Sequence, residues 1–459
     1  MDNPPQITRT LARYIVESRY SDLPASVVHD GRRALLNWVG CSVGGSHHEA
    51  VDKALKVRAR FAGAPQATVI ARGQASDLMS AALINGISSH VHDFDDGQPR
   101  NTNLNPTAAV APAPFALGEH LKAHGREVLH AFILGIEVEC RIANAVYVTD
   151  NARWFTNSTT GVFGAAAAAG KLLGLDEQRM TWALGIAATQ SSGLREMFGT
   201  MCKSFSCGRA AESGLLAAML AEEDFTSSDQ SIEAPRGFAQ VYLPGSDPSP
   251  IIHGLGECYE LPYVTFKPFA CGIVLHAAID VCIQVRERNL LASTLIERIA
   301  IRVHPIVLKI TGNPSPRTGL EGKFSVYHCA AVALVDGAGG ERQFQDDRVN
   351  DPQVLSVRQR IQAEADPAFR RDQASVRVTL TDGRVFEHTV EHAIGTLDNP
   401  LSDAALETKF RALAEGILPD TSVREAIYTC WAVDTLSDFS RLPAAVAGAS
   451  TRAGKGTGG

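Results

Sequence analysis

The feature that most constrains the fold is a set of helical segments built from small residues, found up to about residue 265. The run GAAAAAGKLLGL at 164–175 and the run GRAAESGLLAAMLAE at 208–222 favour helix, and their Gly and Ala side chains permit close packing between helices. Apolar residues spaced three and four apart between 84 and 94 predict a further helix. The first part of the chain is therefore predicted to be all α-helical.

The pattern changes after about residue 268. Apolar and polar residues alternate at 299–304 and 375–380, which predicts strands, and the second strand precedes Asp382-Gly383, a strong hairpin signal. The apolar run at 324–337 predicts a helix between them. The expected fold is mainly α, with a large helical domain built from both chain ends and a smaller α+β domain. The predicted order is the helical domain at 1–266, the α+β domain at 267–397, a returning helical segment at 398–442 and a disordered tail at 443–459.

Charge and hydropathy exclude several classes of partner. The chain has 43 Lys and Arg residues against 50 Asp and Glu residues, which gives a formal net charge of −7 and argues against nucleic-acid binding. It lacks an apolar run long enough for a transmembrane helix, so no membrane association is expected. The first 20 residues mix both charges without an apolar signal core, which indicates a cytoplasmic protein.

The chain also lacks the usual signatures of cofactors and metals. Its nine cysteines are scattered, odd in number and free of C-x-x-C pairs, and only Cys202 and Cys207 come near ligand spacing. No phosphate-binding loop, dinucleotide fingerprint or serine-nucleophile elbow occurs in a fitting context. We therefore predict no metal and no cofactor, and we expect acid–base chemistry on an anionic small molecule.

Two segments of the helical region have the residues for such chemistry. In NGISSHVHDFDDG, at 85–97, His90 and Asp93 are three apart, which places them on one helix face and suits proton transfer. The alternative is a capped helix end with solvated acids. In MCKSFSCGRAAESG, at 201–214, Lys203 and Arg209 flank a predicted helix start, where a carboxylate or phosphate binds well. The alternative is a pair of exposed surface cations.

Three further positions stand out. Lys267 lies at the proposed domain boundary, where ligand clefts are common, with His276 on the following helix, although a Lys before Pro also suits a solvated loop. His328 lies inside an apolar helix, where a His is either a catalyst lining a cleft or a satisfied core residue. The polar residues that precede the Ala-rich helix offer either an N-cap, at Ser158 or Thr159, or an anion site.

These segments, taken in order, resemble the MmgE/PrpD family over nearly the whole chain. The resemblance is carried by NGISSHVHDFDDG, the Ala-rich stretch from FGAAAAAG to CGRAAESG, DFTSSD, FKPFACG, GKFSVYHCAAVALVDG and LETKF. Members of this family dehydrate 2-methylcitrate, decarboxylate cis-aconitate or epimerise iminodisuccinate. The resemblance implies a large helical domain built from both chain ends, a smaller α+β lid domain, a cleft between them and a homodimer.

The resemblance also implies roles for individual residues. The acidic residue of the family's DFDD motif matches Asp93, the motif His matches His90, and the two cleft lysines match Lys203 and Lys267. Three His positions of the family are replaced, by Asn105, by Phe155 with Thr156 beside it, and by Ser206, while a family Tyr position matches His328 with Tyr327 beside it.

The predicted function is a cofactor-free lyase that abstracts a proton from, and dehydrates, a small di- or tricarboxylic acid such as 2-methylcitrate. In this hypothesis His328 transfers the proton with Asp93, and the lysines clamp carboxylates. Decarboxylation, epimerisation, and carboxylate binding without turnover remain alternatives, since Asn, Phe and Ser cannot exchange protons near neutral pH. The predicted catalytic residues are Asp93, His328, His90, Lys203 and Lys267, and the predicted substrate-binding residues are Asn105, Thr156, Ser206, Arg209, Tyr327 and His276.

Overall fold

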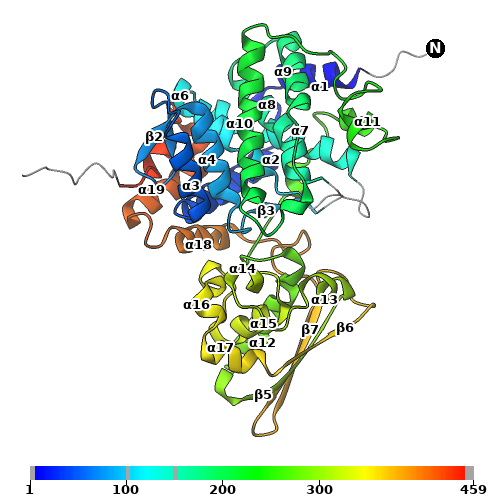
Figure 1. The fold of residues 1–459 in the computed structure, drawn as a ribbon, viewed down its shortest axis with the longest axis vertical. Coiled ribbons are helices and arrows are strands. Elements are labelled where there is room, and N and C mark those ends of the chain that lie inside the picture. Colours follow the sequence, from blue (N-terminus) through cyan, green and yellow to red (C-terminus); the bar gives the residue numbers. More distant parts are fainter. Residues whose placement is uncertain (1–5, 100–103, 148–153, 450–459) are drawn as a thin grey trace, which may run out of the picture. The chain divides into compact units, whose positions relative to one another are not determined.

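The computed structural model describes residues 6–99, 104–147 and 154–449, and it divides into two compact units (Figure 1). The first unit comprises the described residues of Met1–Val91, Asp95–Val264 and Asp403–Gly459, and the second comprises His92–Phe94 and Thr265–Ser402. The prediction of a mainly α fold with a smaller α+β part is confirmed. Among the described residues, no helix combines the length and apolar character needed to cross a membrane.

The first unit is a bundle of helices with one small hairpin. Its hairpin consists of β1 (Ala67–Val69) and β2 (Gln74–Ser76), paired antiparallel, and a two-residue strand β3 (Asp96–Gly97) lies further along the chain. Its helices are α1 (Ile7–Glu17), α2 (Ala25–Gly45), α3 (Glu49–Arg58), α4 (Leu78–His90), α5 (Pro106–Val110), α6 (Pro112–Leu121), α7 (Gly125–Val146), α8 (Thr156–Leu172), α9 (Glu177–Thr189), α10 (Cys202–Glu222), α11 (Phe238–Tyr242), α18 (Asp403–Ala414), α19 (Asp420–Trp431) and α20 (Arg441–Ala445).

Small residues set the helix spacing in the core of this unit. A Cβ placed on Gly86 of α4 would lie 2.5 Å from the Cα of Gly208 on α10, so the two backbones nearly touch. A Cβ placed on Gly164 of α8 would lie 2.6 Å from the carbonyl oxygen of Gly135 on α7. Larger side chains would force these helices apart, and the packing predicted from the small-residue runs is therefore present.

The C-terminal part of the chain returns to this helical unit. Phe410 of α18 packs against Gly40 of α2, where a Cβ would lie 2.9 Å from the Phe410 ring. The predicted tail begins too early, because Pro443 and Val446 are buried, and the amide N–H groups of Ala71 and Gly73 donate to the carbonyl oxygens of residues 446 and 447 at 2.7 Å. Residues 450–459 of the predicted tail lie outside the described residues.

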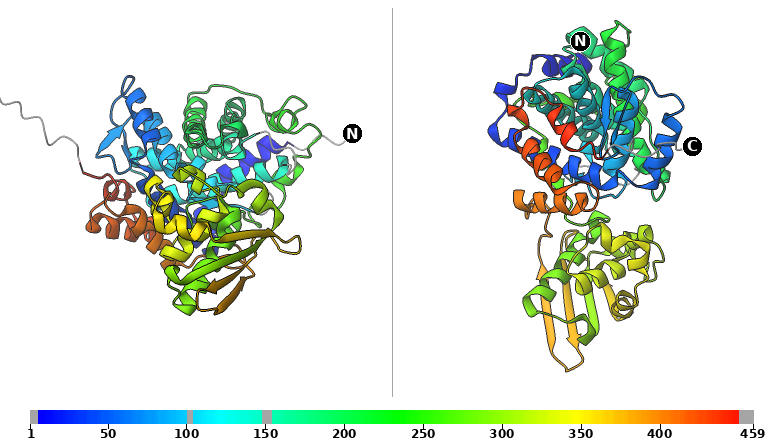
Figure 2. Two further views of the ribbon diagram at one scale, coloured as in Figure 1. Left: turned by 60° about the horizontal axis from the view of Figure 1, so that its bottom comes forward. Right: turned by 90° about the vertical axis from the view of Figure 1, so that its left-hand side faces the viewer.

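The second unit is a four-stranded sheet with helices on one side (Figure 2). The strand order is β6-β5-β7-β8, with β5 parallel to β6 and antiparallel to β7. The predicted hairpin at Asp382-Gly383 is confirmed, because it joins β7 to its antiparallel neighbour β8, and Gly383 has the positive φ of 87° that such turns favour. The strands of this sheet are β5 (Ile296–Val303), β6 (Ile361–Ala365), β7 (Ala374–Leu380) and β8 (Val385–Val390), and the two-residue strand β4 (Thr265–Phe266) is not part of it.

Alternating side chains of the sheet form the core of this unit. Ile299 and Ile301 on β5 pair with Val378 and Val376 on β7, and all four side chains are buried. Helix α12 packs against β7 and β8 and contacts α15. The predicted helix at 324–337 is α15. The helices of the unit are α12 (His276–Asn289), α13 (Pro305–Thr311), α14 (Gly319–Gly322), α15 (Val326–Asp336), α16 (Asp346–Val349) and α17 (Pro352–Arg358).

Candidate active site

The residues predicted for the site occur in both units, and the first group lies where α4 ends. This helix starts at Asp77, whose carboxylate accepts a hydrogen bond from the Ser80 N–H at 2.9 Å, and it ends at His90. The Nδ1 atom of His90 lies 2.6 Å from Oδ2 of Asp95, and both side chains are fully buried. A carboxylate at Nδ1 fixes the orientation of the ring, as in other His–Asp pairs of acid–base sites.

The expectation that Asp93 lies on the same helix face as His90 is wrong, and Asp95 pairs with the ring instead. The three-residue spacing holds only while the helix continues, whereas α4 ends at His90. Asp93 has a φ of 55°, in the left-handed region, and it belongs to the second unit. The turn at Asp93 therefore separates the two acids and leaves Asp95 beside the ring.

The other edge of the His90 ring is not hydrogen-bonded. Within the described residues its Nε2 atom has no partner, and the ring stacks on Phe155, with centroids 6.0 Å apart and an interplanar angle of 30°. Phe155 packs edge to face on Phe198 at 5.2 Å, and Nζ of Lys203 lies 5.6 Å from the centre of that ring. The aromatic pair therefore lies beside both His90 and Lys203 in the helical unit.

Asn105 belongs to a buried hydrogen-bond network of the helical unit. Its backbone N–H donates to Oδ1 of Asn157 at 3.2 Å, and its side-chain oxygen accepts from Nδ2 of Asn157 at 2.9 Å. Its own side-chain amide donates to the carbonyl oxygen of Asp96. The carboxylate of Asp96 accepts from the hydroxyl of Thr107 at 2.8 Å and from its N–H at 3.2 Å. Asn105 is thus held in place by three hydrogen bonds to two residues, Asn157 and Asp96.

Two carboxyl groups of the helical unit, those of Asp96 and Glu139, are fully buried. Burial, and then the neighbouring Asp95 carboxylate, raises the pKa of Asp96 to about 7. Glu139 on α7 is fully buried, and within the described residues neither of its carboxylate oxygens has a hydrogen-bond partner. Burial, and then the charge of Asp96, raises the pKa of Glu139 well above its ordinary value. Glu139 therefore holds its proton more tightly in the folded than in the unfolded protein.

This difference predicts that Glu139→Gln stabilises the protein at neutral and alkaline pH. The wild-type protein loses stability as the pH rises above the unfolded-state pKa of about 4.3, because the unfolded chain releases the proton first. Gln has no proton to lose, so the melting temperature at pH 8 is expected to rise by several degrees, and its fall with pH should flatten.

Scanning calorimetry between pH 5 and 8 measures this effect. The matched control is Glu137→Gln, since the Glu137 carboxylate accepts hydrogen bonds from the Glu260 N–H at 2.7 Å and from Arg141, and its loss should destabilise. Equal destabilisation of both variants at every pH would show that Glu139 is ionised and paired in the folded protein.

In the second unit, Lys267 and Asp93 form a pair. The ammonium of Lys267 donates to Oδ1 of Asp93 and to its backbone carbonyl oxygen, each at 3.0 Å. The Lys267 side chain is only 6% exposed and that of Asp93 17% exposed. The left-handed turn at Asp93 presents both oxygens to one ammonium, so Asp93 fixes the direction of the Lys267 side chain.

A second buried lysine, Lys323, binds the residue that precedes Asp93. The ammonium of Lys323 donates to the carbonyl oxygen of His92 at 2.7 Å and to Oε2 of Glu341 at 2.6 Å, and Nδ1 of His92 lies 3.0 Å from Oε1 of Glu341. Burial opposes ionisation of Glu341, but the charges of Lys323 and then His92 hold its pKa below the ordinary value. The short segment 92–94 is thus fastened to the second unit by two ammonium groups.

His276 and Tyr327 are also in this unit. His276 is buried at the start of α12, its ring lies edge to face with Phe269 at 5.6 Å, and within the described residues its Nε2 atom has no partner. The thiol of Cys271 lies beside it. Burial opposes ionisation of that thiol, but contacts with Cys329 and His276 lower its pKa. Tyr327 is half-buried on α15. Roles in substrate binding for His276 and Tyr327 stay predictions.

His328 is enclosed by its own unit. It is fully buried, its Nε2 atom lies 2.8 Å from the carbonyl oxygen of Gln343, and its ring lies edge to face with Phe344 at 5.6 Å. Burial lowers its pKa to about 4; the hydrogen bond to Gln343 acts in the opposite direction, and the charges of Arg358 and Arg348 add to the effect of burial. Within the described residues its Nδ1 atom has no partner, but burial and the two nearby cations oppose the charged ring, so it is poorly suited to accept a substrate proton. We therefore do not retain the proton-transfer role expected for His328.

His328→Ala should accordingly affect stability more than chemistry. Removal of the ring leaves a cavity and an unpaired carbonyl at Gln343, which is expected to cost about 2–4 kcal/mol of unfolding free energy. The kcat of the folded variant should remain within about tenfold of the parent value, a smaller loss than removal of a general base causes. Urea unfolding and initial rates on the same preparation measure both. A hundredfold loss of kcat with unchanged stability would restore the original hypothesis.

The remaining predicted residues form local contacts in the helical unit. The Ser206 hydroxyl donates to the carbonyl oxygen of Cys202 at 2.8 Å, and Arg209 donates to the Glu212 carboxylate at 2.7 Å from well inside α10. Arg209 therefore does not flank the helix start as predicted. The Thr156 hydroxyl lies 3.5 Å from the hydroxyl of Tyr242. Helix α8 begins at Thr156 without a side-chain cap, so the predicted caps at residues 158 and 159 are also wrong.

Sequence reasoning missed three buried polar residues of the helical unit. Asp95 and Asp96 lie within the recognised DFDD run, but their burial and partners depend on the turn after α4. Lys409 lies within the recognised LETKF run, and its ammonium donates to Oδ1 of Asn37 at 2.7 Å and to the carbonyl oxygen of Asp95 at 3.4 Å. Only contacts between distant parts of the chain reveal this role.

Comparison with known proteins identifies the family. Residues 9–251 match the MmgE/PrpD N-terminal domain, and residues 269–433 match the MmgE/PrpD C-terminal domain. The chain belongs to the MmgE/PrpD family. Cis-aconitate decarboxylase of Homo sapiens is 29% identical over 463 residues, which cover 97% of this chain and 95% of that protein.

Two other relatives differ in how much of the chain they match. Cis-aconitate decarboxylase of Aspergillus terreus is 27% identical over 468 residues, covering 95% of each chain. The 2-methylcitrate dehydratase of Escherichia coli K12 is 24% identical over 253 residues, covering 50% of this chain and 52% of that protein. The similarity to cis-aconitate decarboxylases thus extends over both units, and the similarity to the dehydratase over about half of the chain.

Proposed function

We propose that this protein of the MmgE/PrpD family is a lyase that transfers a proton on a small di- or tricarboxylic acid with its own side chains. The observation that carries the proposal is the Lys267–Asp93 pair, in which a nearly buried ammonium is directed by a carboxylate and a carbonyl oxygen. Such an ammonium is a strong point charge for a substrate carboxylate. Lys203 and Lys267 are proposed to bind carboxylates of the substrate.

The chemistry requires stabilisation of negative charge. When a proton leaves the carbon next to a carboxylate, or when a C–C bond to a carboxylate breaks, the electron pair spreads onto the remaining conjugated carboxylate. A fixed ammonium lowers the energy of that state more than the energy of the substrate, which is the condition for catalysis. We assign the proton transfer to His90, whose Nδ1 atom is held by Asp95 and whose Nε2 atom has no protein partner among the described residues.

Dehydration and decarboxylation are both open to such a site. In dehydration, the base takes the proton and hydroxide then leaves from the adjacent carbon. In decarboxylation, CO₂ leaves first and the acid returns a proton to the carbon. Similarity over both units to cis-aconitate decarboxylases favours decarboxylation of an unsaturated tricarboxylate as the second candidate beside dehydration of 2-methylcitrate.

A substrate panel distinguishes the candidates. The protein is incubated separately with cis-aconitate and 2-methylcitrate, and unsaturation is followed by ultraviolet absorbance and CO₂ release by a coupled assay. Rising absorbance with 2-methylcitrate without CO₂ indicates dehydration, and CO₂ release from cis-aconitate indicates decarboxylation. Calorimetric binding of either acid without turnover would contradict the lyase proposal and favour a carboxylate-binding protein. The expected homodimer and cytoplasmic location stay predictions.

A further inference from the structure

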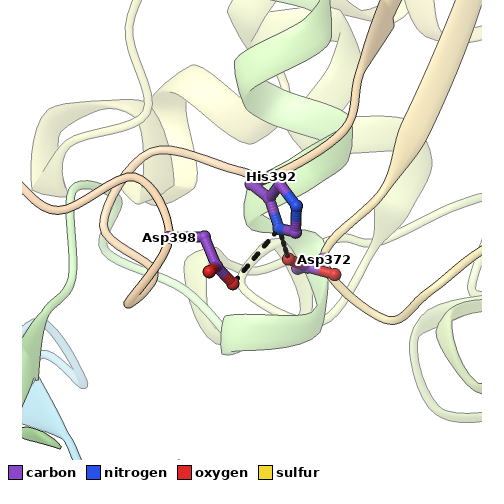
Figure 3. A group of neighbouring side chains, drawn as sticks. All are labelled: Asp372, His392 and Asp398. Carbon is purple, nitrogen blue, oxygen red and sulfur yellow. Dashed lines mark hydrogen bonds and ion pairs between the residues drawn. The ribbon is translucent and has the colours of Figure 1, made fainter.

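One group of side chains among the described residues has the spacing of metal ligands, and it lies in the second unit (Figure 3). Asp372 precedes β7, His392 follows β8, and Asp398 lies in the loop after His392. Nδ1 of His392 lies 2.7 Å from Oδ2 of Asp372 and 3.4 Å from Oδ2 of Asp398. Both carboxylates therefore point at the same ring nitrogen, as the close-up shows.

The sheet brings two of these ligands together. Strands β7 and β8 are antiparallel, and Ala374 pairs with Val390 at the open end of their hairpin. Asp372 lies two residues before that pair and His392 two residues after it, so the two side chains must emerge side by side. The Ala393 N–H donates to the carbonyl oxygen of Asp372 at 3.0 Å, which fixes the two segments to each other.

The third ligand is carried by a loop that is internally bonded. In the loop 393–399, the Gly395 N–H donates to the carbonyl oxygen of Asn399 at 2.8 Å, and Nδ2 of Asn399 donates to the carbonyl oxygen of His392 at 3.1 Å. The Ile394 N–H donates to Asp280 on α12 at 2.8 Å. These bonds hold the loop that presents Asp398 before any ion arrives, which lowers the ordering cost of binding.

The distances suit a tetrahedral ion with nitrogen and oxygen ligands. Zn²⁺ holds such atoms at about 2.0–2.2 Å, which places neighbouring ligand atoms about 3.4 Å apart. The distance between Nδ1 of His392 and Oδ2 of Asp398 is already 3.4 Å. The shorter contact to Asp372 is a hydrogen bond, and it would open by about 0.7 Å when the ion replaces the proton on Nδ1. Solvent can supply the fourth ligand, because Asp398 is exposed.

A neighbouring cation is the alternative partner of these groups. Arg370 lies 3.6 Å from Oδ1 of Asp372 and 3.5 Å from Nε2 of His392, and it also bonds to Glu391. These contacts involve the far oxygen of Asp372 and the far ring nitrogen of His392. Arg370 therefore leaves the three proposed ligand atoms facing one another.

The loop that carries Asp398 also packs against the two residues that flank Lys267. A Cβ placed on Gly395 would lie 2.6 Å from Cδ of Pro268 and 2.8 Å from the carbonyl oxygen of Phe266, the two neighbours of Lys267. Gly395 has a positive φ of 84°, so this close approach requires glycine. Anything that fixes the loop 393–399 therefore also supports the backbone that carries Lys267.

We propose that Asp372, His392 and Asp398 form a binding site for Zn²⁺, and that the bound ion fastens the loop 393–399 against the segment that carries Lys267. One imidazole and two carboxylates match the ligand preference of Zn²⁺, whereas Mg²⁺ and Ca²⁺ require six or more oxygen ligands. The site does not depend on the proposed lyase function, since none of the three ligands takes part in it.

Zinc binding to the full-length protein tests the proposal. Protein stripped with EDTA and dialysed is titrated with ZnCl₂ against a chromophoric chelator, and bound zinc is counted by mass spectrometry. One equivalent of Zn²⁺ per chain and a rise in melting temperature are expected. His392→Ala and Asp398→Asn should each weaken binding at least about tenfold and abolish the rise in melting temperature. Asp398 is exposed in a loop, so its variant should fold even if His392→Ala does not.

The control is His388→Ala, because His388 on β8 lies 2.9 Å from Oε1 of Gln284 and is outside the ligand group. Its zinc affinity should equal that of the parent protein. The proposal is overturned if the stripped protein binds no stoichiometric zinc, if His392→Ala and Asp398→Asn bind it as tightly as the parent, or if Mg²⁺ binds more tightly than Zn²⁺. Lyase activity is not a readout, so failure here leaves the proposed function standing.

Discussion

Lys267→Met is expected to lower kcat/KM for cis-aconitate or 2-methylcitrate, whichever is turned over, by roughly 10²- to 10³-fold. The ammonium is held by two oxygen atoms of Asp93 and is nearly buried, so water cannot replace its charge on the substrate. If it acts mainly on the charge that develops during reaction, kcat should fall more than KM rises. Steady-state kinetics on the folded variant measures the two constants separately.

The control for Lys267→Met is a second salt bridge of the same unit. Arg348 pairs with Asp336, and both side chains are about one-fifth exposed, at 22% and 19%. Arg348→Met should therefore destabilise the unit modestly and leave kcat/KM within about threefold of the parent value. An equal loss of activity in both variants would mean that Lys267 acts through the stability of the second unit and not on the substrate.

His90→Asn is expected to reduce kcat by roughly 10²- to 10⁴-fold, the contribution of a positioned general acid or base. Asp95→Asn should cause a smaller loss, because it removes only the partner that fixes the orientation of the ring. Each single variant also leaves a buried group unpaired, which costs about 3–5 kcal/mol when that group is charged. Loss of activity in a single variant therefore cannot by itself distinguish a catalytic pair from a structural pair.

The double variant His90→Asn with Asp95→Asn separates the two roles. It removes the unpaired charge, so much of the unfolding free energy lost in the single variants should return, while the proton-transfer group is still absent. The account predicts recovered stability and kcat no higher than that of His90→Asn alone. Recovery of both stability and turnover would show that the pair is structural, and proton transfer would then have to be assigned elsewhere.

Elements with strong local patterns were predictable from the sequence. The hairpin between β7 and β8 followed from alternation and the Asp382-Gly383 turn, and α15 followed from an apolar run that ends at Gly337, which takes the left-handed C-cap conformation. Strand β6 was not predicted, because its five residues form a strand only through parallel pairing with β5, more than fifty residues earlier. Short strands without a turn signal depend on such distant partners.

The site was predictable as a list of residues, but not as a set of contacts. The sequence identified His90, Asp93 and Lys267 as site residues, but it did not show that a left-handed turn follows His90 at Asp93. Because of this turn, Asp95 pairs with His90, and Asp93 pairs with Lys267. The burial of Glu139 and the convergence of ligands at His392 depend on which helices and strands pack together. A single sequence does not encode these packing choices in any local pattern.

The most direct test of the central claim, that the protein's own side chains transfer a proton on a polycarboxylate, is deuterium incorporation from solvent. Protein stripped with EDTA is incubated in D₂O with cis-aconitate and with 2-methylcitrate, and the acids are analysed by NMR. We expect that one acid is converted and that the decarboxylated product or the recovered substrate carries solvent deuterium next to a carboxylate, with the signal lost in His90→Asn. Stripped protein that binds both acids but neither converts nor deuterates them would contradict this claim.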